Sequence, residues 1–262
     1  MMNIRSNRIF LSIFFDLIKS DLKRRYLGTY LGGFWAIAGP LSIIAVLLTV
    51  FNFGFRAAPV QNISFDIWMV TGLIVWFYVN DAIISAGNSI IEYSFLVKKI
   101  KFPIGVIPWV KTTSTMYIHI ANLLFLFFLL MYRDERISLY WLQLPYYMLA
   151  MYLLSVAIGN LFAIFQVFVK DFNGVMQIVM QIGFWATPVL WNQAILPEKY
   201  KLFVFLNPID YIVEGYRNTF LFDVWFFNDL ISASYFWCFT FSILFLGKVL
   251  LRKTQGHFAD VL

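Results

Sequence analysis

Apolar residues in this chain are gathered into long runs that are separated by shorter polar segments. A helix needs about 20 apolar residues to cross the hydrocarbon core of a membrane. Several runs meet or approach this length, and we predict six membrane spans, over residues 32–53, 67–91, 108–131, 141–168, 173–191 and 231–250. An even number of spans places both chain ends on the same side of the membrane.

Residues 1–31 have a different pattern, because their apolar stretch is too short to cross a membrane. Polar side chains recur there every three or four positions, at Arg8, Ser12, Asp16, Lys19 and Lys23, and apolar ones fill the other side of the helix, at Ile9, Phe10, Ile13, Phe14, Leu17 and Ile18. This pattern predicts an amphipathic helix lying in the membrane interface. It runs directly into a full span, unlike a cleaved secretory signal. We therefore divide the chain into this interface segment, 1–31, and a transmembrane domain, 32–262.

Two connections are longer than a simple turn. The inner connection, residues 92–103, pairs apolar residues with three lysines and ends at Pro103, as expected either for a docking helix or for a simple orientation signal. The external connection, residues 192–230, holds prolines and apolar runs too short to cross the membrane, which predicts a re-entrant helical hairpin. The predicted fold is an all-α polytopic membrane protein of six transmembrane helices with these additions.

Composition supports a membrane protein, since 61% of the residues are hydrophobic, 20% aromatic and only 13% charged, with a mean hydropathy of +0.76. The net charge of +6 raised the alternative of nucleic-acid binding. With both termini in the cytoplasm, however, 14 Lys and Arg residues lie inside and six outside, the latter being Arg56, Arg133, Arg136, Lys199, Lys201 and Arg217. The positive-inside rule therefore explains the charge, and we expect no nucleic-acid partner.

The sequence lacks several catalytic signatures. The only Gly-Lys pair is Gly247-Lys248 inside the last span, so no phosphate-binding loop is present and ATP hydrolysis would need another chain. There is no Ser nucleophile elbow and no H-E-x-x-H motif. The single cysteine, Cys238, excludes an intramolecular disulfide, and no Cys/His cluster has metal spacing. We expect no catalytic residue, metal or cofactor on this chain.

Polar side chains nevertheless form stripes inside the spans, where they should face other helices or a wet path. The second span carries Phe77, Asp81, Ser85, Asn88 and Glu92, and the third carries Lys111, Thr115, His119 and Asn122 as a possible partner face. We favour a buried interhelical hydrogen bond for Asp81 and His119 over a proton relay.

The fifth predicted span carries Asn173, Gln177, Gln181 and Trp185 at a constant spacing of four. Amide side chains and aromatic faces are the groups that hold hydroxyl-rich ligands such as sugars. Further tryptophans, Trp35 and Trp76 among them, add aromatic faces, although anchoring at the membrane interface explains any single one equally well.

The order of these features resembles the type-2 ABC exporter permeases, and in particular the membrane subunits of bacterial polysaccharide exporters. The resemblance rests on Asp21-Leu-Lys-Arg-Arg-Tyr26, Leu31-Gly-Gly-Phe-Trp35 with Pro40, Val97-Lys-Lys-Ile-Lys-Phe-Pro103 with Val106-Ile-Pro108, Lys170-Asp-Phe172, Thr187-Pro188, Ile195-Leu-Pro-Glu-Lys199, Asn207-Pro208 and Phe258-Ala-Asp-Val-Leu262. Two positions depart from the family pattern. Ile104 stands where a basic residue is frequent, and Lys170 where arginine is frequent, so a bidentate contact at 170 is not expected.

The resemblance implies a homodimer in the bacterial inner membrane that binds two copies of a separate ATPase, which holds ATP and Mg²⁺. The substrate would be an undecaprenyl-linked polysaccharide, most simply an O-antigen, with capsule and wall polymers left open. Residues assigned to ATPase coupling are Phe95, Leu96, Val97, Lys98, Lys99, Lys101, Lys170, Asp171 and Phe172. Those assigned to the substrate channel are Trp35, Trp76, Phe77, Asp81, Asn173, Gln177, Gln181 and Trp185, and those assigned to an external gate are Pro197, Asn207 and Pro208.

Two alternatives stay open from sequence. A type-2 exporter of a small molecule, such as a drug or haem-related compound, would have the same architecture without a polymer channel. A proton-coupled transporter or a membrane glycan-modifying enzyme would instead use Asp81 and His119, although the two halves of the chain show no convincing inverted repeat.

Overall fold

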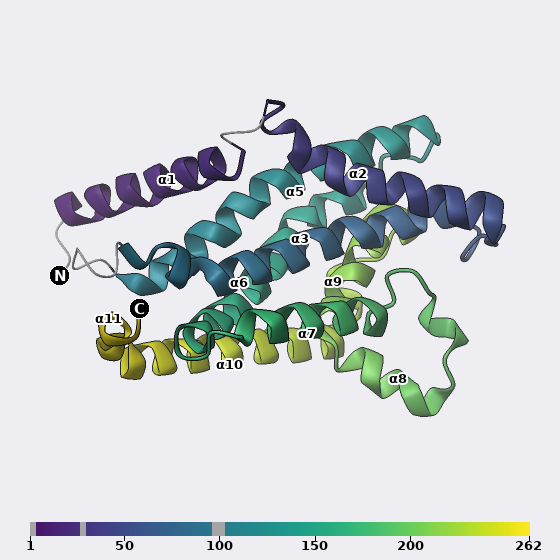
Figure 1. The fold of residues 1–262 in the computed structure, drawn as a ribbon. Helices are drawn as coiled ribbons and strands as arrows, with labels where there is room; N and C mark the ends of the chain where they lie inside the picture. The colour runs from purple at the N-terminus through teal and green to yellow at the C-terminus, as the bar shows by residue number, and fades with distance from the viewer. Residues whose placement is uncertain (1–3, 27–29, 96–102) are drawn as a thin grey trace.

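The computed structural model describes residues 4–26, 30–95 and 103–262. Nearly all of this part is helical, and its only β pairing is an isolated bridge between Val60 and Ile63, so the all-α prediction is confirmed. Figure 1 shows the long helices lying side by side, with α1 (Ile4–Tyr26) and α11 (Phe258–Val261) at one end of the bundle. We call this the terminal end. The opposite end, where α8 (Glu198–Phe205) lies, is the hairpin end.

In the described part of the chain, five helical segments are long and apolar enough to cross a membrane. They agree with five of the predicted spans to within a few residues at most boundaries. Their main helices are α2 (Phe34–Thr49), which continues as a π-helical turn to Gly54, α3 (Phe65–Glu92), α5 (Ile107–Tyr132), α6 (Leu144–Phe168) and α10 (Leu230–Thr254).

The span predicted over 173–191 corresponds to a shorter helix, α7 (Phe172–Ala186), of 15 residues. At 1.5 Å per residue this helix is about 22 Å long, less than the roughly 30 Å of a bilayer core. It ends where it does because Thr187 precedes Pro188 and adopts an extended conformation (ψ 135°), which proline imposes on the residue before it. A sixth span at this place stays a prediction.

The amphipathic segment forms the helix that the sequence predicts. On α1, the polar positions Ser12, Asp16 and Lys19 are exposed, whereas Ile18 and Asp21 are buried. The buried side packs against α5, so the helix contacts the bundle as well as having an exposed polar face. The burial of an acidic residue, Asp21, is the one feature that the apolar pattern did not indicate.

The external connection folds as a helical hairpin of α8 and α9 (Pro208–Arg217). Asn207 caps α9 by accepting a hydrogen bond from the backbone N–H of Ile209 (3.0 Å), and Pro208 occupies the first turn, where its missing N–H costs nothing. Helix α8 is mostly exposed, but α9 packs against α3, α6 and α10. The hairpin is therefore present, while its depth in a membrane stays a prediction.

Helix α3 lies at the centre of the bundle. Residues on different sides of its first half, such as Met69, Val70 and Leu73, are all fully buried, as expected where a helix is surrounded by others. Small residues let α6 approach it closely, because a Cβ atom added to Gly159 would lie 2.5 Å from the Cβ of Ala86. Gly159 follows Ser155 by four positions, a spacing of small residues that permits such close packing of helices.

The guanidinium group of Arg217 is fully buried and joins α9 to α3 and to the segment after α7. Its Nη1 donates to the carbonyl of Pro188 (2.8 Å) and to Oε1 of Glu214 (2.7 Å), and its Nη2 donates to the carbonyl of Val189 (3.0 Å). The guanidinium lies 3.4 Å over the Trp68 ring of α3. These contacts fix the segment after α7, and α9 itself, on the central helix.

The close approach of Arg217 to α3 requires a glycine. A Cβ atom added to Gly72 would lie 2.8 Å from the Nη2 atom of Arg217. From sequence, Arg217 is only one of the external basic residues, because it lies outside every predicted span.

We predict that Arg217→Met lowers the free energy of unfolding by about 3–5 kcal/mol, since it leaves two buried carbonyl groups and the Glu214 carboxylate without their donor. The matched control is Lys201→Met, which removes a cation from a second i,i+3 pair with a glutamate, Glu198, at an exposed place. That change should cost about 0–1 kcal/mol. Thermal unfolding of both variants in detergent, followed by size-exclusion chromatography, checks the difference. Equal midpoints for the two variants would contradict a structural role for Arg217.

Candidate functional site

A groove of about 650 Å³ lies between α2, α3 and α7. Aromatic and amide side chains line it among aliphatic ones, namely Trp76, Phe77 and Asn80 from α3 and Gln177, Gln181 and Trp185 from α7. Ile43 and Leu47 of α2 form the opposite wall. Five of the eight residues that the sequence assigned to a channel are thus brought together: Trp76, Phe77, Gln177, Gln181 and Trp185.

The spacing of four in α7 explains this side of the groove. Gln177, Gln181 and Trp185 follow one another on successive turns, so they share one face of the helix. Met176 and Met180, one position earlier in the first two turns, are buried, and Met176 lies at Gly87 of α3. The groove therefore receives the amide stripe, while the methionines hold α7 on the bundle.

The aromatic rings form a connected row along the groove. The ring centroid of Phe184 lies 5.4 Å from that of Trp76 and 5.3 Å from that of Trp185. Gly183 leaves room for this row, because a Cβ atom there would lie 3.2 Å from Cη2 of Trp76. Rings that present faces and edges beside primary amides offer both apolar contact and hydrogen bonding, without a fixed charge.

The other assigned channel residues lie elsewhere. Trp35 is exposed at the start of α2, next to Phe34, and does not line the groove. Asn173, the first amide of the α7 stripe, accepts a hydrogen bond from Asn88 of α3 (3.0 Å). Its side chain is therefore part of a contact between two helices and not of the groove lining. Asp81 also lies outside the groove lining and belongs to a separate charged cluster.

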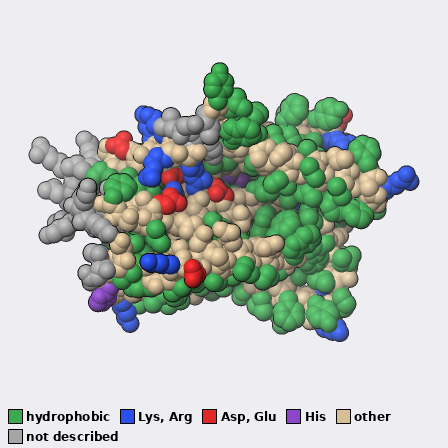
Figure 2. All heavy atoms as spheres, viewed as in Figure 1, with side chains coloured by type: hydrophobic (Ala, Val, Ile, Leu, Met, Phe, Trp, Pro, Cys, Tyr) green, Lys and Arg blue, Asp and Glu red, His purple; other side chains and the backbone are tan. Residues whose placement is uncertain are grey.

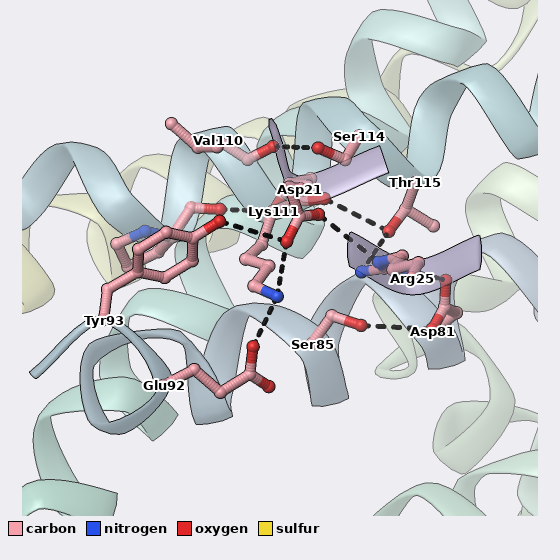
Figure 3. A network of polar contacts seen from close by, with 12 residues as sticks. Asp21, Arg25, Asp81, Ser85, Glu92, Tyr93, Val110, Lys111, Ser114 and Thr115 are labelled. Atoms are coloured by element: carbon pink, nitrogen blue, oxygen red, sulfur yellow. Dashed lines mark hydrogen bonds and ion pairs between the residues drawn. The ribbon is translucent and has the colours of Figure 1, made fainter. Parts of the chain in front are cut away.

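This charged cluster joins α1 to α3 and α5 near the terminal end, and we call it the α1 anchor. It consists of Asp21 and Arg25 of α1, Asp81 and Glu92 of α3, and Lys111 of α5 (Figure 3). Lys111 Nζ lies 2.6 Å from Asp21 and 2.5 Å from Glu92, and Arg25 Nη1 lies 2.9 Å from Asp81. Asp21 and Lys111 are buried, so each needs the other.

Tyr93 completes the α1 anchor from just beyond α3. Its hydroxyl donates to Oδ1 of Asp21 at 3.2 Å. Burial raises the pKa of the Tyr93 hydroxyl to about 12, and the charge of Asp21 adds to the rise. The hydroxyl therefore keeps its proton at neutral pH and stays a donor to the carboxylate.

The anchor corrects the expected partner of Asp81. The sequence offered the stripe of Lys111, Thr115, His119 and Asn122 as the partner face, but the cation that pairs with Asp81 is Arg25, 56 residues away in the chain. Asp21 and Arg25 were missed as a site, although their i,i+4 spacing in the Asp21–Tyr26 block was a readable signal.

His119 has a different partner from Asp81. Its Nε2 atom lies 2.8 Å from the hydroxyl of Tyr216 in α9, and its ring contacts that of Tyr78. His119 and Asp81 both line a small cavity of about 220 Å³, yet each is engaged separately. A buried hydrogen bond between helices, the interpretation favoured from sequence, describes His119.

The residues assigned to ATPase coupling are only partly described. Phe95 is exposed just after α3, and Lys170 and Asp171 are exposed in the turn between α6 and α7. Phe172 packs against Phe162 and Phe165, with centroid distances of 5.6 and 5.4 Å. Leu96, Val97, Lys98, Lys99 and Lys101 lie outside the described residues.

The residues assigned to an external gate hold the hairpin together. Pro197 precedes α8, and Asn207 and Pro208 begin α9. The Nδ2 atom of Asn207 donates to Oγ1 of Thr187 at 2.8 Å, which connects the hairpin to the end of α7.

The surface follows the same division into ends. Figure 2 shows most of the visible charged side chains in the half toward the terminal end, and hydrophobic side chains over the hairpin-end half. Exposed apolar residues are numerous on α2 and α7 on both sides of the groove, including Val46, Ile178 and Ile182.

Comparison with known proteins gives a consistent result over most of the chain. A family model described as ABC-2 type transporter matches residues 13–221, which contain both the groove and the α1 anchor. An O-antigen export system permease protein, RfbA, of Klebsiella pneumoniae is 25% identical over 96% of this chain and 97% of its own length. Another RfbA, of Myxococcus xanthus, is 24% identical over 78% of each chain. A polysialic acid transport protein, KpsM, of Escherichia coli is 24% identical over 91% of this chain and 92% of its own.

The α1 anchor leads to a prediction about Lys111. Replacing it by methionine leaves the carboxylate of Asp21 buried beside α5 without its closest cation, which should release α1 from the bundle. Trypsin should then cleave after Lys19 and Lys23 severalfold faster than in the parent protein. Lys248→Met, which removes a lysine of α10 outside the anchor, is the control. If α1 of the Lys111→Met protein resists trypsin as the parent does, the Lys111–Asp21 pair does not hold it.

Proposed function

The chain belongs to the ABC-2 type transporter family, and we propose that it is the permease subunit of an ATP-driven exporter of undecaprenyl-linked polysaccharide. Its substrate is most simply an O-antigen, and it crosses the bacterial inner membrane. The observation that carries this proposal is the groove, in which uncharged amides and a row of aromatic rings face the same space. Such a lining suits a long hydroxyl-rich chain, because no fixed charge traps one unit of it. The names of the similar proteins point to the same substrate class.

Members of this family are transport subunits whose ATPase is a separate chain. We propose that two copies of this ATPase, with ATP and Mg²⁺, dock at the terminal end. The docking points are residues 92–103 and the turn Lys170-Asp171-Phe172. This chain has no catalytic role of its own in the proposal.

Both docking points lead directly into the walls of the groove. Phe95 follows α3, which carries Trp76 and Phe77, and Phe172 begins α7, which carries Gln177 and Gln181. A displacement imposed by ATP binding would pass along these two helices. At their far end, the bond between Thr187 and Asn207 would carry it into the hairpin, where Pro197, Asn207 and Pro208 act as the external gate.

A channel for a polymer requires a second wall, and we propose that a second copy of the chain supplies it. The exposed apolar faces of α2 and α7 flank the groove, so two copies that meet on these faces would enclose two grooves between them. The proposed orientation puts the terminal end in the cytoplasm, which agrees with the excess of basic residues there.

The volume of the groove also favours one alternative, export of a small molecule. A space of about 650 Å³ is within the range of drug-sized sites, roughly 300–1,000 Å³. Deleting the gene in its native host separates the two functions. Lipid-linked polymer retained inside the cell, and returned to the surface by the restored gene, supports polysaccharide export. Normal surface polysaccharide in the deletion strain favours the small molecule.

The groove assignment makes a specific prediction. Changing Gln177 and Gln181 together to alanine should lower surface polymer severalfold at equal expression, because the passing chain loses two hydrogen-bonding groups. Gln255→Ala, which removes an exposed amide near the C-terminus, should leave export unchanged. Quantitative surface labelling in the complemented deletion strain measures both, and parent-level export by the double variant would reject the groove as the path.

The proposed docking of the ATPase near Phe95 also leads to a prediction. Phe95→Asp places a charge on an exposed aromatic residue next to the inner connection, so the partner ATPase should no longer co-purify with the permease. The control is Phe203→Asp, which makes the same change at an exposed site of α8 at the hairpin end. Retention of the ATPase by the Phe95→Asp protein would show that docking occurs elsewhere.

A further inference from the structure

A second concave region lies at the hairpin end, between α8, α9 and the start of α10. One cavity of about 370 Å³ adjoins another of about 480 Å³, and the two share Gln193, Lys201, Glu214, Asn218 and Val224 in their linings. We call this region the outer vestibule. It is separate from the groove, and its lining contains carboxyl groups as well as amides and aromatic rings, including Asp210, Trp225 and Asp229.

The outer vestibule contains a hydrogen-bonding atom that the protein leaves unused. Asp210 as a whole is half-buried and lines the vestibule, and its Oδ1 atom is buried without a hydrogen-bond partner. Burial raises the pKa of this carboxyl to about 8, with a further rise from Glu214 that Arg217 partly opposes. At neutral pH the group is therefore mainly uncharged and suited to exchange hydrogen bonds with a neutral ligand.

The neighbouring charged groups are already engaged within the protein. Glu214 pairs with Arg217 (2.7 Å), and Lys201 pairs with Glu198 (2.5 Å). Asp229 accepts hydrogen bonds from the backbone N–H and the hydroxyl of Ser232 at the start of α10. Within the described residues no three His, Cys, Asp or Glu side chains are grouped to hold a metal ion.

Trp225 supplies an aromatic wall that is held in place. Its ring stacks on Phe227 with 11° between the planes, and it lies 4.9 Å from the ring of Tyr140. Gln143 fixes the backbone on both sides, because it donates to the carbonyl of Val224 and accepts from the N–H of Phe226, each at 2.8 Å. This wall is therefore ordered before any ligand arrives.

The groove and the outer vestibule are neighbours along the chain. Trp185 and Leu190 line the groove, and Asn192 and Gln193 line the vestibule. The indole N–H of Trp191 donates to the carbonyl of Trp185 at 3.0 Å and folds this connecting segment. On α3, Trp76 lies in the groove and Trp68 in the vestibule, eight residues or about 12 Å apart.

We propose that the outer vestibule is a binding site for a sugar unit of the exported polymer after it leaves the groove. Asp210 exchanges a hydrogen bond with a hydroxyl group of the sugar, and Trp225 contacts the sugar ring. The inference rests on the proposed export of polysaccharide and adds a site on the far side of the membrane path.

The test uses a photoreactive side chain in the complete exporter, in cells that make the native polymer. p-Benzoylphenylalanine replaces Trp225 in the vestibule, Trp185 in the groove, or Ile137, an exposed residue of the external α5–α6 connection, as the control. After irradiation, polymer attached to the purified permease is measured with a lectin or antiserum against the surface polysaccharide. We expect attachment at Trp225 and Trp185 at least tenfold above that at Ile137.

The outcomes separate this inference from the proposed function. Attachment at Trp185 without attachment at Trp225 overturns the vestibule and leaves polymer export intact. Attachment at neither position, in cells whose surface polymer is normal, overturns the groove path as well. Attachment at Ile137 equal to that at Trp225 also overturns the vestibule, because the polymer then contacts the outer face without selection.

Variants of Asp210 give a second measurement on the same site. In the protein with the photoreactive group at 225, Asp210→Asn keeps a hydrogen-bonding group of the same shape and should retain attachment. Asp210→Leu removes it and should lower attachment severalfold, while attachment from position 185 stays unchanged. Equal attachment in the Asn and Leu proteins would contradict a direct contact between Asp210 and the polymer.

Discussion

The buried guanidinium group of Arg217 is the interaction on which the hairpin end depends. A charge without water must have partners for its donors, and here they are two backbone carbonyl groups after α7, a glutamate of α9 and the face of Trp68 in α3. The wall of the groove and the wall of the outer vestibule are consequently both held against the central helix, α3. A substrate path that passes from one to the other would have walls that keep their spacing.

At the opposite end, the buried charges of the α1 anchor are stabilised by neighbouring charges of opposite sign. Two cations bridge three carboxylates across α1, α3 and α5, and the most buried members, Asp21 and Lys111, are in direct contact. The central helix thus makes polar contacts in its first half, at Trp68, and in its second half, at Asp81 and Glu92. Both sets of contacts lie on one continuous helix, α3.

The sequence allowed the local features to be predicted, and the reasons are physical. Run length identified five spans, and the spacing of four placed Gln177, Gln181 and Trp185 on one face. Interaction partners that are distant in the chain could not be predicted from the sequence. Arg25 reaches Asp81 only because α1 folds back on the bundle, and Arg217 was counted as an external basic residue because no periodicity records a buried cation. Trp35, which the sequence assigned to the substrate channel, does not line the groove, and residue type alone does not tell an anchoring aromatic from a lining one.

The early end of α7 has a consequence for the lipid bilayer itself. A helix of about 22 Å beside a hydrocarbon layer of about 30 Å creates a hydrophobic mismatch, and a bilayer relieves such a mismatch by thinning next to the short segment. Contact with a second copy on the side where the groove opens would relieve the mismatch in another way, because the short helix would then face protein rather than lipid.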